Sequence, residues 1–261
     1  MPTDHVIYDH AEALAYVTFN RPDSRNAMTW EMYETLVTLC DTVESNTSVR
    51  VVVLRGSGGK AFVAGSDIKQ FRTFKSAEDG INYERRLDTV IDRLEAVSKP
   101  TIAQIEGYAT GGGFALAAAC DIRICTPDSK FGVPIARTLG NCLSANNHAR
   151  FLDLVGPARL KELLYTGKLL TAQEALAAGL VNRIVEPEKI DSEVRRIALE
   201  IAANAPLTIK ATKEMIRRIQ YERRLNTGKS KDLIAMCYTS SDFKEGVSAF
   251  IEKRPPQWRG N

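Results

Sequence analysis

The chain has 261 residues, of which 44% are hydrophobic and 26% are charged. These fractions are typical of a folded protein with a sizeable core, and they exclude a disordered, collagen-like or disulfide-bonded miniature protein. Basic and acidic side chains number 35 and 32, so the net charge is only +3. Such a balance indicates neither a nucleic-acid partner nor an anionic membrane surface.

The sequence shows neither a targeting segment nor a cysteine pattern typical of disulfides or metal sites. No apolar run approaches the roughly 20 residues that cross a bilayer, and the first 19 residues lack the pattern of a signal or transit peptide. The five cysteines are odd in number and scattered, without the spacing of a disulfide framework or a zinc site. We therefore expect no metal, no membrane span and a cytoplasmic location.

Strand and helix signals alternate in the first part of the chain. Two β-prone runs, Val6–Tyr8 and Leu14–Phe19, predict an opening hairpin. Helical spacing follows from Thr29, a candidate N-cap, through Glu44. Val49–Leu54 is a continuous β-branched run, which is typical of a strand buried on both faces. Further elements are predicted at Ala61–Val63 (strand), Ala77–Val97 (helix), Thr101–Ile105 (strand) and Phe114–Cys120 (helix).

Beyond about Gly140 the pattern becomes helical. Amphipathic segments separated by glycine and proline breaks predict helices at Ala149–Leu154, Ala158–Tyr165, Thr171–Ala178, Ile190–Ala203, Thr208–Arg224, Lys231–Thr239 and Asp242–Lys253. Strands joined by helical crossovers favour an α/β fold with a largely parallel sheet. We expect a core over residues 1–200 and a helical oligomerisation region over residues 201–261.

The most specific local feature is the glycine-rich turn from Gly107 to Gly113, between a predicted strand and a predicted helix. Backbone N–H groups at such a helix start can face an anion, although a tight turn or close packing explains glycines equally well. The turn lacks the lysine and hydroxyl of a Walker loop, and Leu116 stands where a dinucleotide fingerprint needs glycine or alanine. Nucleotide hydrolysis and hydride transfer are therefore not indicated.

Four segments together resemble the crotonase superfamily, best known for enoyl-CoA hydratases and isomerases: AFVAGSDIK (61–69), GYATGGGFALAAACDIR (107–123), SKFGVP (129–134) and SDFKEGVSAFIEKRPP (241–256). The likeness covers essentially the whole chain. It implies a spiral of ββα units, a helical trimerisation region, and an acyl-CoA thioester substrate with no other cofactor. It also implies that the backbone N–H groups of Ala64 and Gly112 hold the thioester oxygen, and donors of this kind contribute about 3–4 kcal/mol each to transition-state stabilisation.

The resemblance further implies where CoA binds. The matching positions are Arg25, Ala27, Ser66, Asp67, Ile68, Phe250 and Lys253. Two of these have an equally ordinary structural interpretation: Phe250 as a core residue, and Lys253 as a solvated helix end. The expected assembly is a homotrimer or a dimer of trimers.

The chain departs from the family at the two glutamates that usually position water and move protons. Ala115 and Ile135 stand at these positions, and neither can exchange a proton, whereas acid–base catalysis commonly supplies about 10²–10⁴-fold. The segment that follows offers Asn141 and Ser144 as polar side chains that could face the acyl group. Ser144 could instead cap a helix.

Three functional hypotheses follow. The first is an enzyme of the enoyl-CoA hydratase/isomerase type that stabilises a thioester enolate, with decarboxylation or thioester hydrolysis as other reactions that such a site performs. The second is a non-catalytic acyl-CoA binder that has lost its proton-transfer groups. The third is an RNA-associated protein, resting on the basic stretch Lys210–Lys231, for which a solvated helix face is the simpler explanation.

Overall fold

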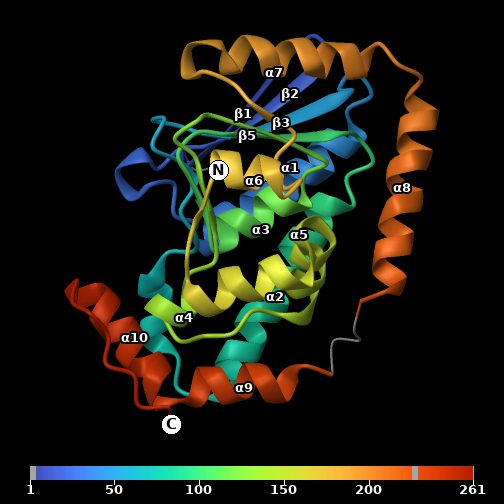
Figure 1. The fold of residues 1–261 in the computed structure, drawn as a ribbon. Helices are drawn as coiled ribbons and strands as arrows, with labels where there is room; N and C mark the ends of the chain where they lie inside the picture. Colours follow the sequence, from blue (N-terminus) through green and yellow to red (C-terminus); the bar gives the residue numbers. More distant parts are fainter. Residues whose placement is uncertain (1–3, 225–228, 261) are drawn as a thin grey trace.

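We describe residues 4–224 and 229–260 of a computed structural model, which contains two β-sheets and ten α-helices within those ranges (Figure 1). The larger sheet has the strand order β1-β2-β3-β5-β7-β10. Its strands are β1 (Val6–Ala11), β2 (Leu14–Phe19), β3 (Val51–Gly56), β5 (Thr101–Ile105), β7 (Ile122–Cys125) and β10 (Arg183–Ile184). Strands β1 and β2 form the predicted antiparallel hairpin, and every later pair is parallel.

The smaller sheet has the order β4-β6-β8-β9, with β4 (Ala61–Val63), β6 (Tyr108–Thr110), β8 (Lys130–Gly132) and β9 (Leu170–Thr171). Strands β3, β5 and β7 of the larger sheet are each followed by a strand of the smaller sheet and then by a helix. Those helices are α2 (Ala77–Glu95), α3 (Gly112–Ala119) and α4 (Ile135–Thr138). The chain therefore repeats a ββα unit, and the ends of β4 and β6 lie side by side.

The larger sheet is covered on both faces. On one face, β3 packs Val51 and Val53 against Ile190 and Val194 of α7 (Pro187–Ala202). On the other, Val52 and Leu54 join the main core with α1 (Trp30–Ser45) and α2. This two-sided burial confirms what the β-branched run predicts, because alternate side chains of a strand point to opposite faces.

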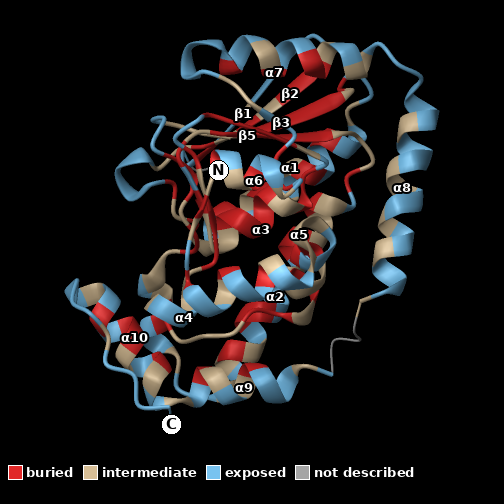
Figure 2. Ribbon diagram, viewed as in Figure 1, coloured by how far each residue is buried: buried red, intermediate tan, exposed pale blue. Residues whose placement is uncertain are grey.

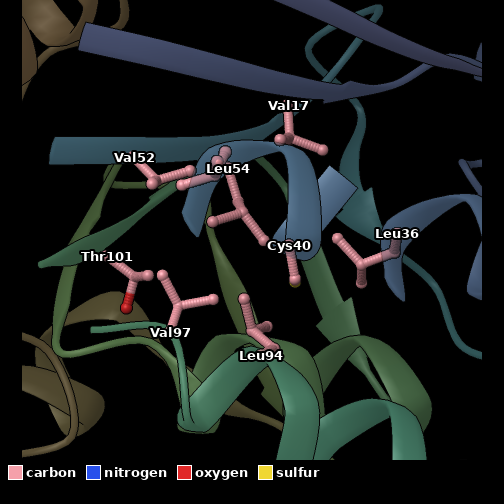
Figure 3. A pocket seen from close by; sticks show the side chains of 9 residues that line it. Val17, Leu36, Cys40, Val52, Leu54, Leu94, Val97 and Thr101 are labelled. Atoms are coloured by element: carbon pink, nitrogen blue, oxygen red, sulfur yellow. The ribbon is translucent and has the colours of Figure 1, made fainter. Parts of the chain in front are cut away.

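Both covering helices on the main-core side begin at side-chain caps. Thr29 accepts a hydrogen bond from Met32 N at the start of α1, and Ser76 and Asp79 form a capping box at the start of α2. Between these helices and the sheet lies a gap of about 10 Å³ (Figure 3), lined almost entirely by apolar side chains. A gap of that size holds at most one water molecule, so it is a packing defect and not a binding site.

The remaining helices are α5 (Ala145–Thr166), α6 (Ala172–Ala177), α8 (Pro206–Glu222), α9 (Lys231–Thr239) and α10 (Ser241–Glu252). Helix α5 merges two predicted segments across a kink at Gly156, where φ is 72°. Helix α8 stands away from the body and buries none of its residues, whereas α9 packs against α2 (Figures 1 and 2).

Two sequence expectations need adjustment. The division at residues 200 and 201 falls inside the last turn of α7, which continues to Ala202. Strands β6 to β10 were not predicted, because segments of two to four residues carry little periodicity, although the equally short β4 was. Among the described helices, none combines the length and the apolarity that crossing a membrane requires.

Candidate active site

A cavity of about 610 Å³ opens between the loop after β4, the start of α3, the middle of α2 and the terminal helix α10. This volume lies within the usual range for small-molecule sites, about 300–1,000 Å³. Its lining includes Arg25, Ala27, Ala64, Ser66, Asp67, Ile68, Gly112, Asn141, Phe250 and Lys253, all of which sequence reasoning selected. Ser144 is the one selected residue outside this lining.

Two backbone N–H groups meet at the inner wall of the cavity. A Cβ atom placed on Gly112 would lie 3.7 Å from the backbone nitrogen of Ser66, so the two peptide units are in contact. Ser66 forms a parallel bridge with Met28 in which the Gly65 carbonyl and the Asp67 N–H face Met28. Because successive peptide groups of an extended chain point to opposite sides, the Ser66 N–H points away from Met28.

Within the described residues, neither the Ser66 nor the Gly112 N–H has a hydrogen-bond acceptor. Gly112 begins α3, where the first N–H groups of a helix lack partners inside the helix. The helix dipole adds partial positive charge at this end. The arrangement can therefore accept a single carbonyl oxygen and stabilise negative charge on it.

The prediction of Ala64 as a donor is wrong. Its N–H donates a 3.1 Å hydrogen bond to the carbonyl oxygen of Arg25, so it is not free for a ligand. The donor that lies beside Gly112 belongs to Ser66, two residues further on. The Ala64 N–H faces the segment that contains Arg25 and Met28, whereas the Ser66 N–H points away from it.

The glycines at the start of α3 are required by close packing. A Cβ on Gly113 would lie 1.9 Å from the Val63 carbonyl oxygen, and one on Gly112 would lie 2.5 Å from Tyr33 Oη. The missing side chains let α3 approach the end of β4 closely enough to set the two N–H groups next to each other.

Three hydroxyl groups form a chain behind these amides. Ser66 Oγ lies 3.0 Å from Tyr33 Oη and 2.7 Å from Tyr83 Oη, and all three residues are buried. Burial raises the pKa of both tyrosines well above the ordinary value, so both hydroxyls stay neutral. The chain fixes the loop that carries the Ser66 N–H against α1 and α2.

The mouth of the cavity carries positive charge and an exposed aromatic ring. Arg25 and Lys253 both line it and both adopt left-handed backbone conformations, with φ of 51° and 56°. The Arg25 guanidinium lies 5.3 Å from the centre of the Tyr108 ring. Phe250 on α10 is 51% exposed, which excludes the interpretation of it as a core residue in this chain.

The positions of the absent glutamates also line the cavity. Ala115, on the first turns of α3, and Ile135, at the start of α4, contribute only methyl and butyl groups. Asn141 lies nearby; its Nδ2 donates to Tyr238 Oη at 3.1 Å, while its buried Oδ1 has no partner. Ser144 instead caps α5, and its hydroxyl donates to Asp88 at 2.6 Å.

Sequence reasoning missed a carboxyl group in the same cavity. Glu84 on α2 lines it and is only 1% exposed. Its Oε1 accepts a 2.7 Å hydrogen bond from Tyr238, and its Oε2 accepts a 2.8 Å bond from the Ser144 N–H. A signal for it existed: Gly80, Tyr83, Leu87 and Ile91 share the buried stripe of α2, and helical spacing places Glu84 in that apolar stripe.

The family model described as enoyl-CoA hydratase/isomerase matches residues 9–261. The chain belongs to the enoyl-CoA hydratase/isomerase family. Among curated relatives, it is 34% identical to the short-chain-enoyl-CoA hydratase of Clostridium acetobutylicum, over 97% of each chain. It is also 34% identical to the (E)-benzylidenesuccinyl-CoA hydratase of Thauera aromatica, over 100% of both chains.

Solved structures of the family have the same fold. A methylmalonyl-CoA decarboxylase complexed with 2S-carboxypropyl CoA superposes with a TM-score of 0.91 at 28% identity, covering 100% of both chains. An enoyl-CoA hydratase/carnithine racemase of Magnetospirillum magneticum has a TM-score of 0.81 at 35% identity, covering 99% of this chain and 97% of that one. The crotonase-type α/β fold predicted from the four motifs is confirmed, and the family is one of enzymes.

Proposed function

We propose that the cavity binds an acyl-CoA thioester and stabilises the enolate formed when the carbon next to its carbonyl loses a substituent. The observation that carries this proposal is the pair of acceptor-free N–H groups of Ser66 and Gly112 at the cavity wall. Negative charge develops on the thioester oxygen in such a reaction. Two preorganised donors directed at one oxygen stabilise that charge without reorganisation.

The shape and charge of the cavity also fit the acyl chain and the CoA part of such a thioester. Its inner part is closed by Ala115, Ile135 and Leu143, which suits an acyl chain, while Arg25 and Lys253 at the mouth suit CoA phosphates. Enoyl-CoA hydratases and a methylmalonyl-CoA decarboxylase are among the relatives and solved structures that the chain matches. Each of these is named for a CoA thioester.

The experiment is a titration with an arylacryloyl-CoA, whose absorbance moves to longer wavelength when hydrogen bonds polarise its thioester carbonyl. We expect saturable binding with a red shift, and binding of CoA alone with none. Binding without a red shift overturns the enolate-stabilising role and favours the non-catalytic binder. RNA retention on the basic helix that survives saturation with CoA favours the third hypothesis.

Decarboxylation is a second candidate because of one observation. The Nδ2 atom of Asn147 is buried in the cavity lining without an acceptor, although the Oδ1 atom of the same side chain accepts from Arg150. An unpaired buried donor favours a substrate carboxylate. Incubation with methylmalonyl-CoA tests this candidate through CO₂ release, which enolate formation by loss of a proton does not give.

We further propose that the chain assembles into a trimer or a dimer of trimers through α8. Its exposed face includes Leu207, Met215, Ile216 and Ile219, each more than half exposed. A contiguous apolar stripe of this kind on an otherwise unburied helix is typical of a subunit interface.

A further inference from the structure

The cavity lacks proton-transfer side chains at the two positions where its family usually has glutamates. Ala115 and Ile135 cannot transfer protons, yet proton transfer is what turns an enolate into a product. Two carboxyl-bearing residues, Asp67 and Glu84, line the cavity within the described residues. Asp67 caps the 3₁₀ turn Ile68–Thr73 and pairs with Arg21 at 3.4 Å. Glu84 is therefore the remaining candidate for proton transfer.

Glu84 reaches the cavity from the same turn of α2 that carries Tyr83, and Tyr83 contacts the Ser66 loop through its hydroxyl. The two donors on Glu84 come from other elements: Tyr238 on α9 and the Ser144 N–H just before α5. The carboxyl group is therefore held by two donors from two other segments, while Glu84 itself lines the cavity. A fixed carboxyl group of this kind meets the geometric requirement for a general acid or base.

No cation neutralises Glu84 within the described part of the chain. Arg85 and Arg86 follow Glu84 in α2, but they pair with Glu78 and Glu34. The charged side chain one turn further along is Asp88, a like charge, and Arg150 pairs with Asp92 and Glu95 and not with Glu84. The other titratable groups facing it are Tyr33, Tyr83, Tyr238 and Cys142, whose pKa values are all raised, so they remain neutral. Burial first, and Asp88 second, raise the pKa of Glu84 to about 8, against the two hydrogen bonds that lower it.

We propose that Glu84 is the proton-transfer group of this site and takes the role of the two glutamates that positions 115 and 135 lack. This inference rests on the proposed function. The ionised carboxylate takes a proton from the carbon next to the thioester carbonyl. The electron pair of that C–H bond moves into the enolate, whose oxygen lies between the Ser66 and Gly112 N–H groups.

The reaction closes without another reactant. Glu84, now protonated, returns the same proton to the enolate, either at the carbon it came from or, in an unsaturated acyl chain, two carbons further along. The first outcome is exchange and the second is a shift of the double bond. One carboxyl group that both removes and returns the proton is sufficient for either, whereas the usual hydration uses two.

The hydrogen-bond directions around Tyr238 support this role. Asn141 Nδ2 donates to Tyr238 Oη, and the Tyr238 hydroxyl hydrogen is then directed to Glu84. Tyr238 and the Ser144 N–H are both donors to the carboxyl group, so neither accepts its proton. The proton that Glu84 gains or loses is therefore exchanged with the contents of the cavity.

The test follows deuterium incorporation into butyryl-CoA, a saturated probe, in heavy water by mass spectrometry. We expect wild-type protein to exchange the protons next to the thioester carbonyl, and Glu84→Gln to be slowed at least about 100-fold with an unchanged dissociation constant. Glu78→Gln, the same change at an exposed position of α2, should exchange at the wild-type rate. Exchange by Glu84→Gln within tenfold of wild type overturns the inference.

The exchange experiment distinguishes failure of the proposed function from failure of the role proposed for Glu84. If wild type neither binds nor exchanges butyryl-CoA, the proposed function fails and this inference falls with it. If wild type exchanges and Glu84→Gln does too, the proposed function stands and only the role of Glu84 is lost.

A second variant keeps the inference testable even if Glu84→Gln does not fold. Wild-type exchange should rise with pH to a midpoint near 8, because the ionised carboxylate is the base. Tyr238→Phe removes a donor that stabilises the carboxylate, so this midpoint should move upward. An unchanged midpoint would leave Glu84 with a merely structural role and overturn the inference.

Discussion

Tyr238 of α9 donates a 2.7 Å hydrogen bond to Glu84 of α2, and the two residues are 154 positions apart in the chain. This bond links the C-terminal helices to the wall of the cavity. The C-terminal part of the chain thus contributes to the site twice, through the support of Glu84 and through Phe250 and Lys253 at the mouth.

The raised pKa of Glu84 predicts a pH-dependent stability. The unfolded chain ionises this carboxyl group above about pH 4.5, whereas the folded protein keeps it protonated to about pH 8. The folded state therefore binds more protons in this window, and its free energy of unfolding falls as pH rises from about 4.5 to about 8. Glu84→Gln should lose this component. Chemical denaturation at pH 5 and pH 8 measures it: the variant should gain on wild type at pH 8, and an equal difference at both pH values contradicts the prediction.

Gly112→Ala tests the close approach at the start of α3. The added methyl group would lie 2.5 Å from Tyr33 Oη, so one of the two must move, and we expect a loss of about 1–3 kcal/mol in the free energy of unfolding. The red shift of bound arylacryloyl-CoA should shrink as well. Tyr33→Phe removes the clashing oxygen, so the double variant should be more stable than the sum of the single effects allows. Strict additivity would show that the methyl group is accommodated elsewhere.

Variants of Lys253 test whether its positive charge contributes to CoA binding at the mouth of the cavity. Lys253→Gly removes the ammonium group and suits the left-handed backbone, where φ is 56°. We expect CoA to bind about 5–10-fold more weakly, equivalent to about 1–1.4 kcal/mol, with less dependence on salt. Lys253→Arg is the matched control and should retain affinity. Equal affinity of the glycine and arginine variants in calorimetry would rule out a phosphate contact.

Glu95 holds three helical segments together and should matter for stability. It accepts hydrogen bonds from Arg224, after α8, at 2.7 and 2.8 Å, and from the buried Arg150 of α5. Burial alone raises the pKa of Glu95, but the bonds and charges of Arg224 and Arg150 outweigh it and the pKa is lowered. Glu95→Gln should lower the free energy of unfolding by about 2–3 kcal/mol at neutral pH.

The lowered pKa of Glu95 sets the pH range in which Glu95→Gln changes the free energy of unfolding. A depressed pKa stabilises the fold above the unfolded-state value, and the contribution disappears as pH falls through the folded-state value. Wild type and Glu95→Gln should therefore converge at acid pH. A difference that stays constant down to acid unfolding would contradict this assignment.

The apolar stripe of α8 predicts an interface that one charge disrupts. Ile216→Asp places a carboxylate in its middle and should convert the assembly to monomers, as measured by light scattering during gel filtration. Arg218→Asp, in the same turn but mostly exposed and paired with Glu214, is the control for added negative charge. A wild-type protein that is already monomeric would contradict the proposed assembly.

Local pattern was sufficient for much of this molecule. Apolar spacing and caps located α1 and α2 to within two residues, and the β-branched run at Val49–Leu54 predicted a strand with two covered faces. The residues at 115 and 135 are read directly from the sequence, so the absence of glutamates there was visible without a structure.

The chemistry of the cavity was decided by tertiary contacts. Whether the N–H of Ala64 or of Ser66 is free depends on which one the Arg25 carbonyl takes, and that carbonyl comes from a segment nearly 40 residues earlier. Glu84 lies in an apolar helical stripe, where sequence spacing shows burial but not the neighbours that make burial tolerable. Those neighbours, Tyr238 and Ser144, arrive from distant parts of the chain. Backbone direction and the partners of a buried charge are properties of the folded chain, because both are set by pairing between segments and not by either segment alone.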